Sequence, residues 1–108
     1  RSLRLSTSLQ VRCLVGQGEA VRGRMLELEE GVTIGRAPQC ELVLSDDRIS
    51  RQHAWIGPED QRIVVRDLDS TNGTLVNGQQ VGTQPLQDGD VIQFGRGPEW
   101  SFRYEMPG

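Results

Sequence analysis

Residues 33–54 read TIGRAPQCELVLSDDRISRQHA, and residues 65–81 read VRDLDSTNGTLVNGQQV. Both stretches consist of short apolar runs separated by turn-forming residues, and neither shows a sustained helical period. The Asn-Gly pair at 77–78 lies between two such runs and is a strong hairpin signal, because a type I′ turn needs two positive φ angles. These stretches therefore predict short β-strands joined by tight turns.

The same pattern extends along the whole chain of 108 residues, a length that suits one domain with one core. We expect a domain over residues 9–105, a disordered lead-in over 1–8 and a tail over 106–108. The predicted fold class is all-β, a sandwich or barrel. Loops are expected at 16–18, 57–60 and 88–90, and candidate strands at 9–15, 25–29, 32–35, 41–44, 53–56, 62–68, 74–76, 79–81, 90–94 and 100–104.

Composition excludes several classes of protein. The net charge of -3 argues against general binding of nucleic acid, which needs a basic face. No apolar run approaches the roughly 20 residues of a membrane helix, and the start shows no signal peptide. Cys13, Cys40 and the single histidine form neither a disulfide framework nor a metal site, so we expect buried free thiols, an intracellular location and no metal. Because Arg1 replaces the usual Met, we expect a piece of a larger multidomain protein.

Four elements at the ends of predicted strands carry the chemistry: residues 35–36, 50–53, 70–74 and 77–78. A phosphate group on a protein offers three acceptor oxygens and about two negative charges. Specific binding requires an arginine fork, hydroxyl groups and free backbone N–H groups that converge from loops on a stiff scaffold. Arg36, Ser50, Arg51 and Thr71 supply these groups.

In this order and spacing, the elements resemble the forkhead-associated (FHA) domain family. The resemblance is carried by residues 33–54, 65–81 and 86–95, the last reading LQDGDVIQFG, and it covers about residues 32–95 continuously. It implies a β-sandwich of about eleven strands in two sheets, which binds phosphothreonine of a partner protein on the loops at one end. It implies no cofactor, and a Ser/Thr protein kinase that writes the mark. The alternative is a phosphate-independent interaction module on the same fold.

The resemblance also implies roles for individual residues. Arg36 and Ser50 should contact the phosphate. Arg51 should offer its backbone N–H, while its side chain either adds a second cation or lies in solvent. The hydroxyl of Thr71 either contacts the phosphate or bonds within its turn, and Asn72 either bonds the main chain of the ligand or stabilises its own turn.

For His53 the resemblance implies a structural role, in which the side chain joins loops by hydrogen bonds. A catalytic pair with Ser50 is disfavoured because no third group is seen to orient the ring, so we expect a binding module and not an enzyme. Asp67 and Asp69 are interpreted as a strand end that runs into a turn. Architectural roles are also expected for Gly35, Gly73, Asn77 and Gly78.

Arg48 lies two residues before Ser50 and has two interpretations. The resemblance implies that its loop contacts the third residue after the phosphothreonine, so Arg48 could pair with an acidic residue there. Alternatively, Asp46 and Asp47 could pair with Arg48 themselves or attract a basic residue of the ligand. Residues 95–97, Gly-Arg-Gly, are interpreted as a hairpin loop.

Overall fold

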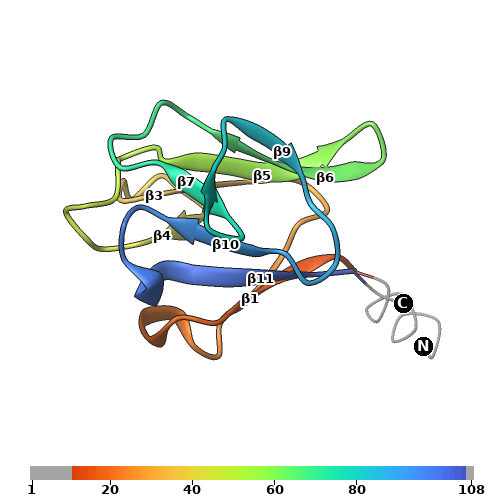
Figure 1. The fold of residues 1–108 in the computed structure, drawn as a ribbon, viewed down its shortest axis with the longest axis horizontal. Helices are drawn as coiled ribbons and strands as arrows, with labels where there is room; N and C mark the ends of the chain where they lie inside the picture. The colour runs from red at the N-terminus through yellow and green to blue at the C-terminus, as the bar shows by residue number, and fades with distance from the viewer. Residues whose placement is uncertain (1–10, 107–108) are drawn as a thin grey trace.

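The structure, a computed structural model, describes residues 11–106 as two β-sheets packed face to face (Figure 1). Residues 11–106 form eleven strands, as expected, and two short 3-10 helices, η1 (Glu19–Val21) and η2 (Pro98–Trp100). The strands are β1 (Cys13–Gly16), β2 (Met25–Glu27), β3 (Val32–Gly35), β4 (Leu42–Val43), β5 (Ala54–Glu59), β6 (Arg62–Asp67), β7 (Thr74–Val76), β8 (Gln79–Gln80), β9 (Thr83–Pro85), β10 (Val91–Phe94) and β11 (Ser101–Glu105).

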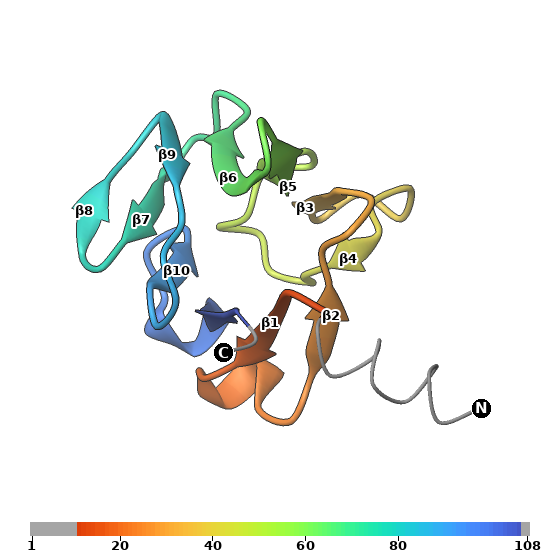
Figure 2. The same ribbon diagram turned by 90° about the vertical axis from the view of Figure 1, so that its right-hand side faces the viewer.

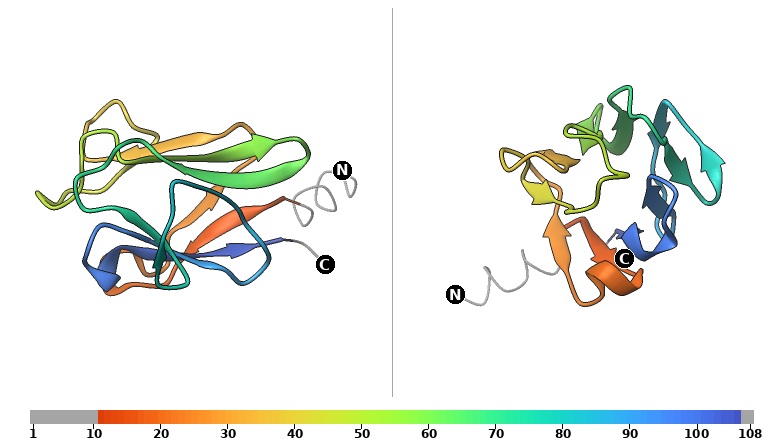
Figure 3. Two further views of the ribbon diagram at one scale, coloured as in Figure 1. Left: turned by 45° about the horizontal axis from the view of Figure 1, so that its top comes forward. Right: turned by 90° about the vertical axis from the view of Figure 1, so that its left-hand side faces the viewer.

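One sheet has six strands in the order β2-β1-β11-β10-β7-β8, and the other has five in the order β4-β3-β5-β6-β9. Figure 2 and the left view of Figure 3 show the two layers, and the buried apolar side chains form one core cluster drawn from both sheets. Within the described residues, β3 and β4 form the one parallel pair of neighbouring strands. The expected all-β sandwich is confirmed.

Alternation along the strands builds the core. In β10, Ile92 and Phe94 are buried while Val91 and Gln93 are partly exposed, as the period of two requires. Phe94 meets Phe102 of β11 edge to face, with ring centroids 5.9 Å apart, a favourable geometry for an aromatic pair. The opposite sheet contributes Ile34, Ile56 and Val65 to the same cluster.

The predicted Asn77-Gly78 hairpin is confirmed. Both residues have positive φ, 51° and 85°, and Val76 pairs with Gln79 across the turn. Asn77 also accepts a hydrogen bond from the Val91 amide and donates one to Asp90, which joins this hairpin to β10.

Two strand predictions were wrong. Residues 57–60 were expected to form a loop, but β5 continues to Glu59, and the turn falls on Asp60 and Gln61, both with positive φ. β3 reaches only Ile56 along β5, so Pro58 lies beyond that pairing, where a missing N–H costs little. Strand β9 was not predicted, because its three residues are polar or proline.

Expectations for the start of the chain are tested only from residue 11. The disordered lead-in over 1–8, and the beginning of the strand expected over 9–15, lie outside the described residues, as do tail residues 107–108. Cys40 is buried as expected, but Cys13 is only partly buried, and both thiols are free. No helix within residues 11–106 has the length and apolar character needed to cross a membrane.

Candidate functional site

Three loops meet at one end of the sandwich, and the sheet register explains why. β3 runs antiparallel to β5 and parallel to β4, so the loops after β3 and β4 both lie at the end of the sheet where β5 begins. β6 is antiparallel to β5 and pairs its last residue, Asp67, with Ala54, so the loop after β6 starts at the same edge. These loops, residues 36–41, 44–53 and 68–73, lie together in Figure 1 and face the viewer on the right of Figure 3.

Backbone hydrogen bonds hold the first two loops together. The amides of Arg36 and Ala37 donate to the carbonyls of Ser50 and Arg51, at 2.9 and 3.1 Å. This close approach explains Gly35, because a Cβ atom there would lie 2.2 Å from the Arg51 carbonyl oxygen. The loop surface is therefore set by backbone geometry before any ligand arrives.

The Arg36 side chain is exposed but oriented. Its Nε donates a hydrogen bond to the Ile49 carbonyl at 3.0 Å. The two terminal amino groups have no hydrogen-bond partner within residues 11–106. A guanidinium held at Nε and open at its ends can bind two oxygens of one phosphate.

Ser50 and Thr71 bring the second and third loops together. The Thr71 amide donates to Ser50 Oγ at 3.0 Å. Because that bond uses Oγ as an acceptor, the Ser50 hydroxyl hydrogen stays available to donate. The Thr71 hydroxyl and the Arg51 amide make no hydrogen bond within the described part of the chain, so both can still serve a ligand.

The Asn72 side chain has one group that stabilises the loops and one that is left for a ligand. Its Nδ2 donates to the Arg48 carbonyl at 2.8 Å, a contact between the second and third loops. Its Oδ1 accepts no hydrogen bond from residues 11–106. The amide oxygen can therefore accept an N–H from the main chain of a ligand while the amide nitrogen keeps the loops in place.

His53 is completely buried under these loops. Its Nδ1 accepts the Ser50 amide hydrogen at 3.1 Å, and its Nε2 lies 2.8 Å from the Gly73 carbonyl oxygen. These contacts define the tautomer with the proton on Nε2. Since both ring nitrogens bind backbone groups, His53 is not placed to take a proton from the Ser50 hydroxyl.

Asp67 orders the loop that carries Thr71 and Asn72. Its carboxylate accepts hydrogen bonds from the Ser70 hydroxyl at 2.5 Å, the Thr74 hydroxyl at 2.7 Å and the Ser70 amide at 3.1 Å. The sequence analysis placed Asp67 at a strand end, which is correct, but missed this role. The spacing Asp-x-x-Ser before a glycine is a signal that could have suggested it.

We expect Asp67→Ala to lower the free energy of unfolding by about 1–3 kcal/mol, because several partly buried donors lose their acceptor. Thermal and urea unfolding of the purified domain would measure the change. Asp47→Ala is the matched control, because Asp47 is exposed and accepts no hydrogen bond from the described residues. Equal stability of the two variants would contradict the ordering role of Asp67.

Arg48 adopts the second of its two predicted arrangements, with Asp46 as predicted but with Glu99 in place of Asp47. It binds Asp46 through Nε at 3.0 Å and through a terminal amino group at 2.7 Å, and it also pairs with Glu99. Trp100 Nε1 donates to Asp46 at 2.8 Å, and Asp47 makes no such contact. Arg48 holds the pKa of the Asp46 carboxyl well below its usual range, and hydrogen bonds also lower the pKa of Glu99.

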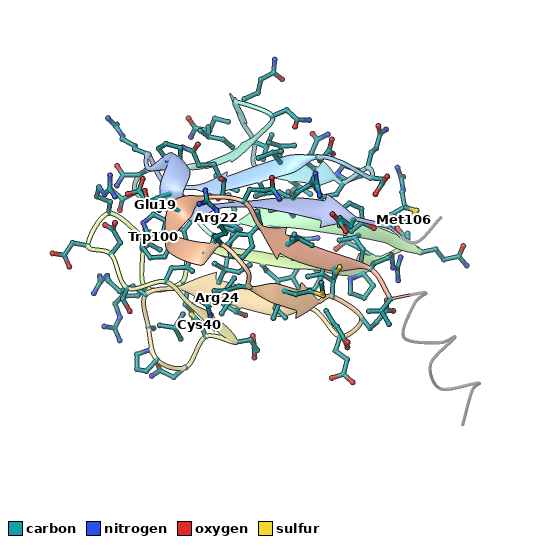
Figure 4. All side chains as sticks on the ribbon, turned by 90° about the horizontal axis from the view of Figure 1, so that it is seen from below. Glu19, Arg22, Arg24, Cys40, Trp100 and Met106 are labelled. Carbon is teal, nitrogen blue, oxygen red and sulfur yellow. The ribbon has the colours of Figure 1, made fainter. Side chains whose placement is uncertain are left out.

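Two ion pairs and one indole hydrogen bond join the second loop to η2, and they involve Asp46, Arg48, Glu99 and Trp100. Figure 4 shows Trp100 at the same end of the molecule as Cys40, with Met106 at the other end. Within residues 11–106, no three His, Cys, Asp or Glu side chains are arranged to hold a metal ion.

Comparisons with known proteins agree with this geometry. A profile of the FHA domain family matches residues 32–95. The FHA domain-containing protein FhaA of Mycobacterium tuberculosis is 43% identical over 74 residues, which are 68% of this chain and 14% of FhaA. An oxoglutarate dehydrogenase inhibitor of Corynebacterium efficiens is 36% identical over 83 residues, or 77% of this chain and 58% of the inhibitor.

Among solved structures, an FHA domain from work on phosphothreonine-dependent FHA domain interactions superposes with a TM-score of 0.73 and 35% identity. The match covers 89% of this chain and 95% of that one. By contrast, the chain spans less than two thirds of the length of both curated relatives, which are longer proteins.

Proposed function

The chain belongs to the FHA domain family, a family of binding modules, and we propose that its three-loop end binds phosphothreonine in partner proteins. The observation that carries the proposal is the set of unused donors at one surface. The Arg36 amino groups, the Ser50 hydroxyl and the Arg51 amide all come from loops that backbone hydrogen bonds hold together. The relation to an FHA domain studied for phosphothreonine-dependent interactions supports it.

Binding uses charge-assisted hydrogen bonds and involves no cofactor and no bond cleavage. Each such bond contributes about 1.5–3 kcal/mol, and the cost of ordering a flexible peptide opposes their sum. We expect micromolar dissociation constants, which correspond to a binding free energy of about -8 kcal/mol. Affinity of this order suits reversible signalling. A Ser/Thr protein kinase must phosphorylate the partner before this domain can bind it. We expect the kinase and this domain to share an intracellular compartment.

The test is a calorimetric titration of the purified domain with three peptides of one sequence carrying phosphothreonine, phosphoserine or unmodified threonine. We expect the phosphothreonine peptide to bind several-fold to about tens-fold more tightly than the phosphoserine peptide. Burial of the γ-methyl is worth about 0.8 kcal/mol, and close packing adds to it.

The unmodified peptide should bind at least about a hundredfold more weakly than the phosphothreonine peptide, since it offers the donors no charged acceptor. Equal binding of phosphorylated and unmodified peptides across a library would favour the alternative, a phosphate-independent interaction module. Equal binding of phosphothreonine and phosphoserine would retain phosphate recognition but contradict the expected burial of the γ-methyl group.

A further inference from the structure

Strand β2 leaves one side of its backbone free. It lies at the end of the six-stranded sheet, and Figure 2 shows it on the same side of the sandwich as β4. The Gly16 amide of β1 donates to the Arg24 carbonyl at 2.8 Å. Because bonding alternates along an antiparallel pair, the N–H and C=O groups of Met25 and Glu27 point away from β1. Within residues 11–106, no second strand pairs with these groups.

The other three edge strands carry features that limit pairing with another chain. Strand β9 ends in Pro85, which has no N–H group. Beside β4, the Glu41 side chain accepts the Thr33 amide hydrogen at 2.6 Å, and β8 has only two residues. Strand β2 contains no proline, and it carries Met25, which at 68% is the most exposed large apolar side chain of residues 11–106. Of the four edges, β2 is therefore the one best suited to pairing.

Charge along the β2 edge is divided into two halves. The exposed side chains of Arg22 and Arg24 come before Met25, and three exposed glutamates follow it, at 27, 29 and 30. The glutamates lie around a hollow of about 390 Å³, which is lined by Glu27, Glu29, Glu30, Gly31, Val32 and Glu41. Among residues 11–106, Arg12 pairs with Glu29 and the other three carboxylates form no ion pair. The hollow therefore has an excess of negative charge.

This division of charge fits a second copy of the chain. Antiparallel pairing about a twofold axis at Leu26 sets Met25 of one copy opposite Glu27 of the other, and each such pair exchanges both backbone hydrogen bonds. The arginine half of each copy then lies along the glutamate half of the other, beside its hollow. The β2 edge is thus complementary to itself, as a twofold interface requires.

We propose that two copies of this chain associate through their β2 edges, so that their six-stranded sheets join into one continuous sheet. The proposal goes beyond phosphothreonine binding and does not rest on it, because β2 is not part of the three loops. The contact between two short strands is small, so the association is weak. It falls with added salt, because exposed charges contribute to it.

The test is sedimentation equilibrium of the chain at low salt, over concentrations up to about 1 mM. We expect the average mass to rise from one chain toward two. One variant carries Arg22→Glu and Arg24→Glu, and a second carries Glu27→Arg and Glu30→Arg. Each alone should associate at least about tenfold more weakly than wild type, because like charges then face each other. An equal mixture of the two variants should associate at least as well as wild type, because opposite charges face each other again.

Two further measurements test the backbone contact. Met25→Pro removes an outward N–H and leaves the bonds to β1 in place, so it should weaken the dimer. Hydrogen exchange at the Met25 and Glu27 amides should be fast in dilute wild type and slow as concentration rises. Arg62→Glu is the control, because Arg62 is exposed at the start of β6 in the other sheet, and it should dimerise like wild type.

Three results would overturn the proposal. One is a wild-type mass of one chain at every concentration. Another is a dimer that persists in both charge-reversed variants, which would place the interface elsewhere. The last is slow exchange of the Met25 and Glu27 amides even at high dilution, which would mean that another segment of the chain already covers the edge. Titration of the same variants with a phosphothreonine peptide tests the three loops separately, so either proposal can fail while the other stands.

Discussion

Arg36→Ala should weaken binding of a phosphothreonine peptide by about tenfold to a hundredfold or more, while the domain stays folded. The alanine variant loses the guanidinium that Ile49 orients toward the loop end. Because the side chain is exposed, its removal leaves the core intact. Calorimetric titration of wild type and variant with the same peptide would give the ratio of dissociation constants, and circular dichroism would verify the fold.

Arg36→Lys separates charge from geometry. A lysine keeps the positive charge but loses the fork and the Nε donor that binds the Ile49 carbonyl, so we expect most of the affinity loss to remain. Arg62→Ala is the control for the loss of one positive charge in Arg36→Ala, because Arg62 lies at the start of β6, far from the three loops. Affinity of the Arg36→Ala variant equal to that of wild type would remove the central claim about the site.

Much of the fold could be predicted because its signals are local. Strands β3 and β7 fall on the predicted residues, and the Asn77-Gly78 turn follows from a preference for positive φ that two neighbouring residues carry. The end of β5 could not be predicted in this way. Glycine and proline at 57–58 favour a turn locally, but pairing with β6 and the absence of β3 alongside Pro58 make a strand possible there.

In the candidate site, too, local signals could be read from the sequence and long-range contacts could not. Arg36, Ser50 and Thr71 could be named from local motifs and Asn72 from the family resemblance, and the structure places them on neighbouring loops. Their hydrogen-bond partners could not be predicted, because they come from distant parts of the chain. Arg48 illustrates this limit, since Glu99 lies 51 residues away and competes with any ligand for its charge.

His53→Ala should lower the melting temperature by about 10–20 °C, which corresponds to about 2–4 kcal/mol for a domain of this size. The substitution removes two hydrogen bonds and leaves the Ser50 amide and the Gly73 carbonyl without their partner. It also opens a cavity beside Phe94, whose ring meets the imidazole edge to face with centroids 6.0 Å apart. Thermal unfolding followed by circular dichroism would measure the shift.

The control is Gln52→Ala, one residue away and exposed, which should leave the melting temperature nearly unchanged. Peptide binding should be measured well below the melting temperature of the His53 variant, so that unfolded protein does not contribute. We expect a moderate loss of affinity, because the loops that carry Ser50 and Gly73 are no longer joined through the ring. A variant that melts like wild type yet selectively loses phosphopeptide binding would show instead that His53 contacts the ligand.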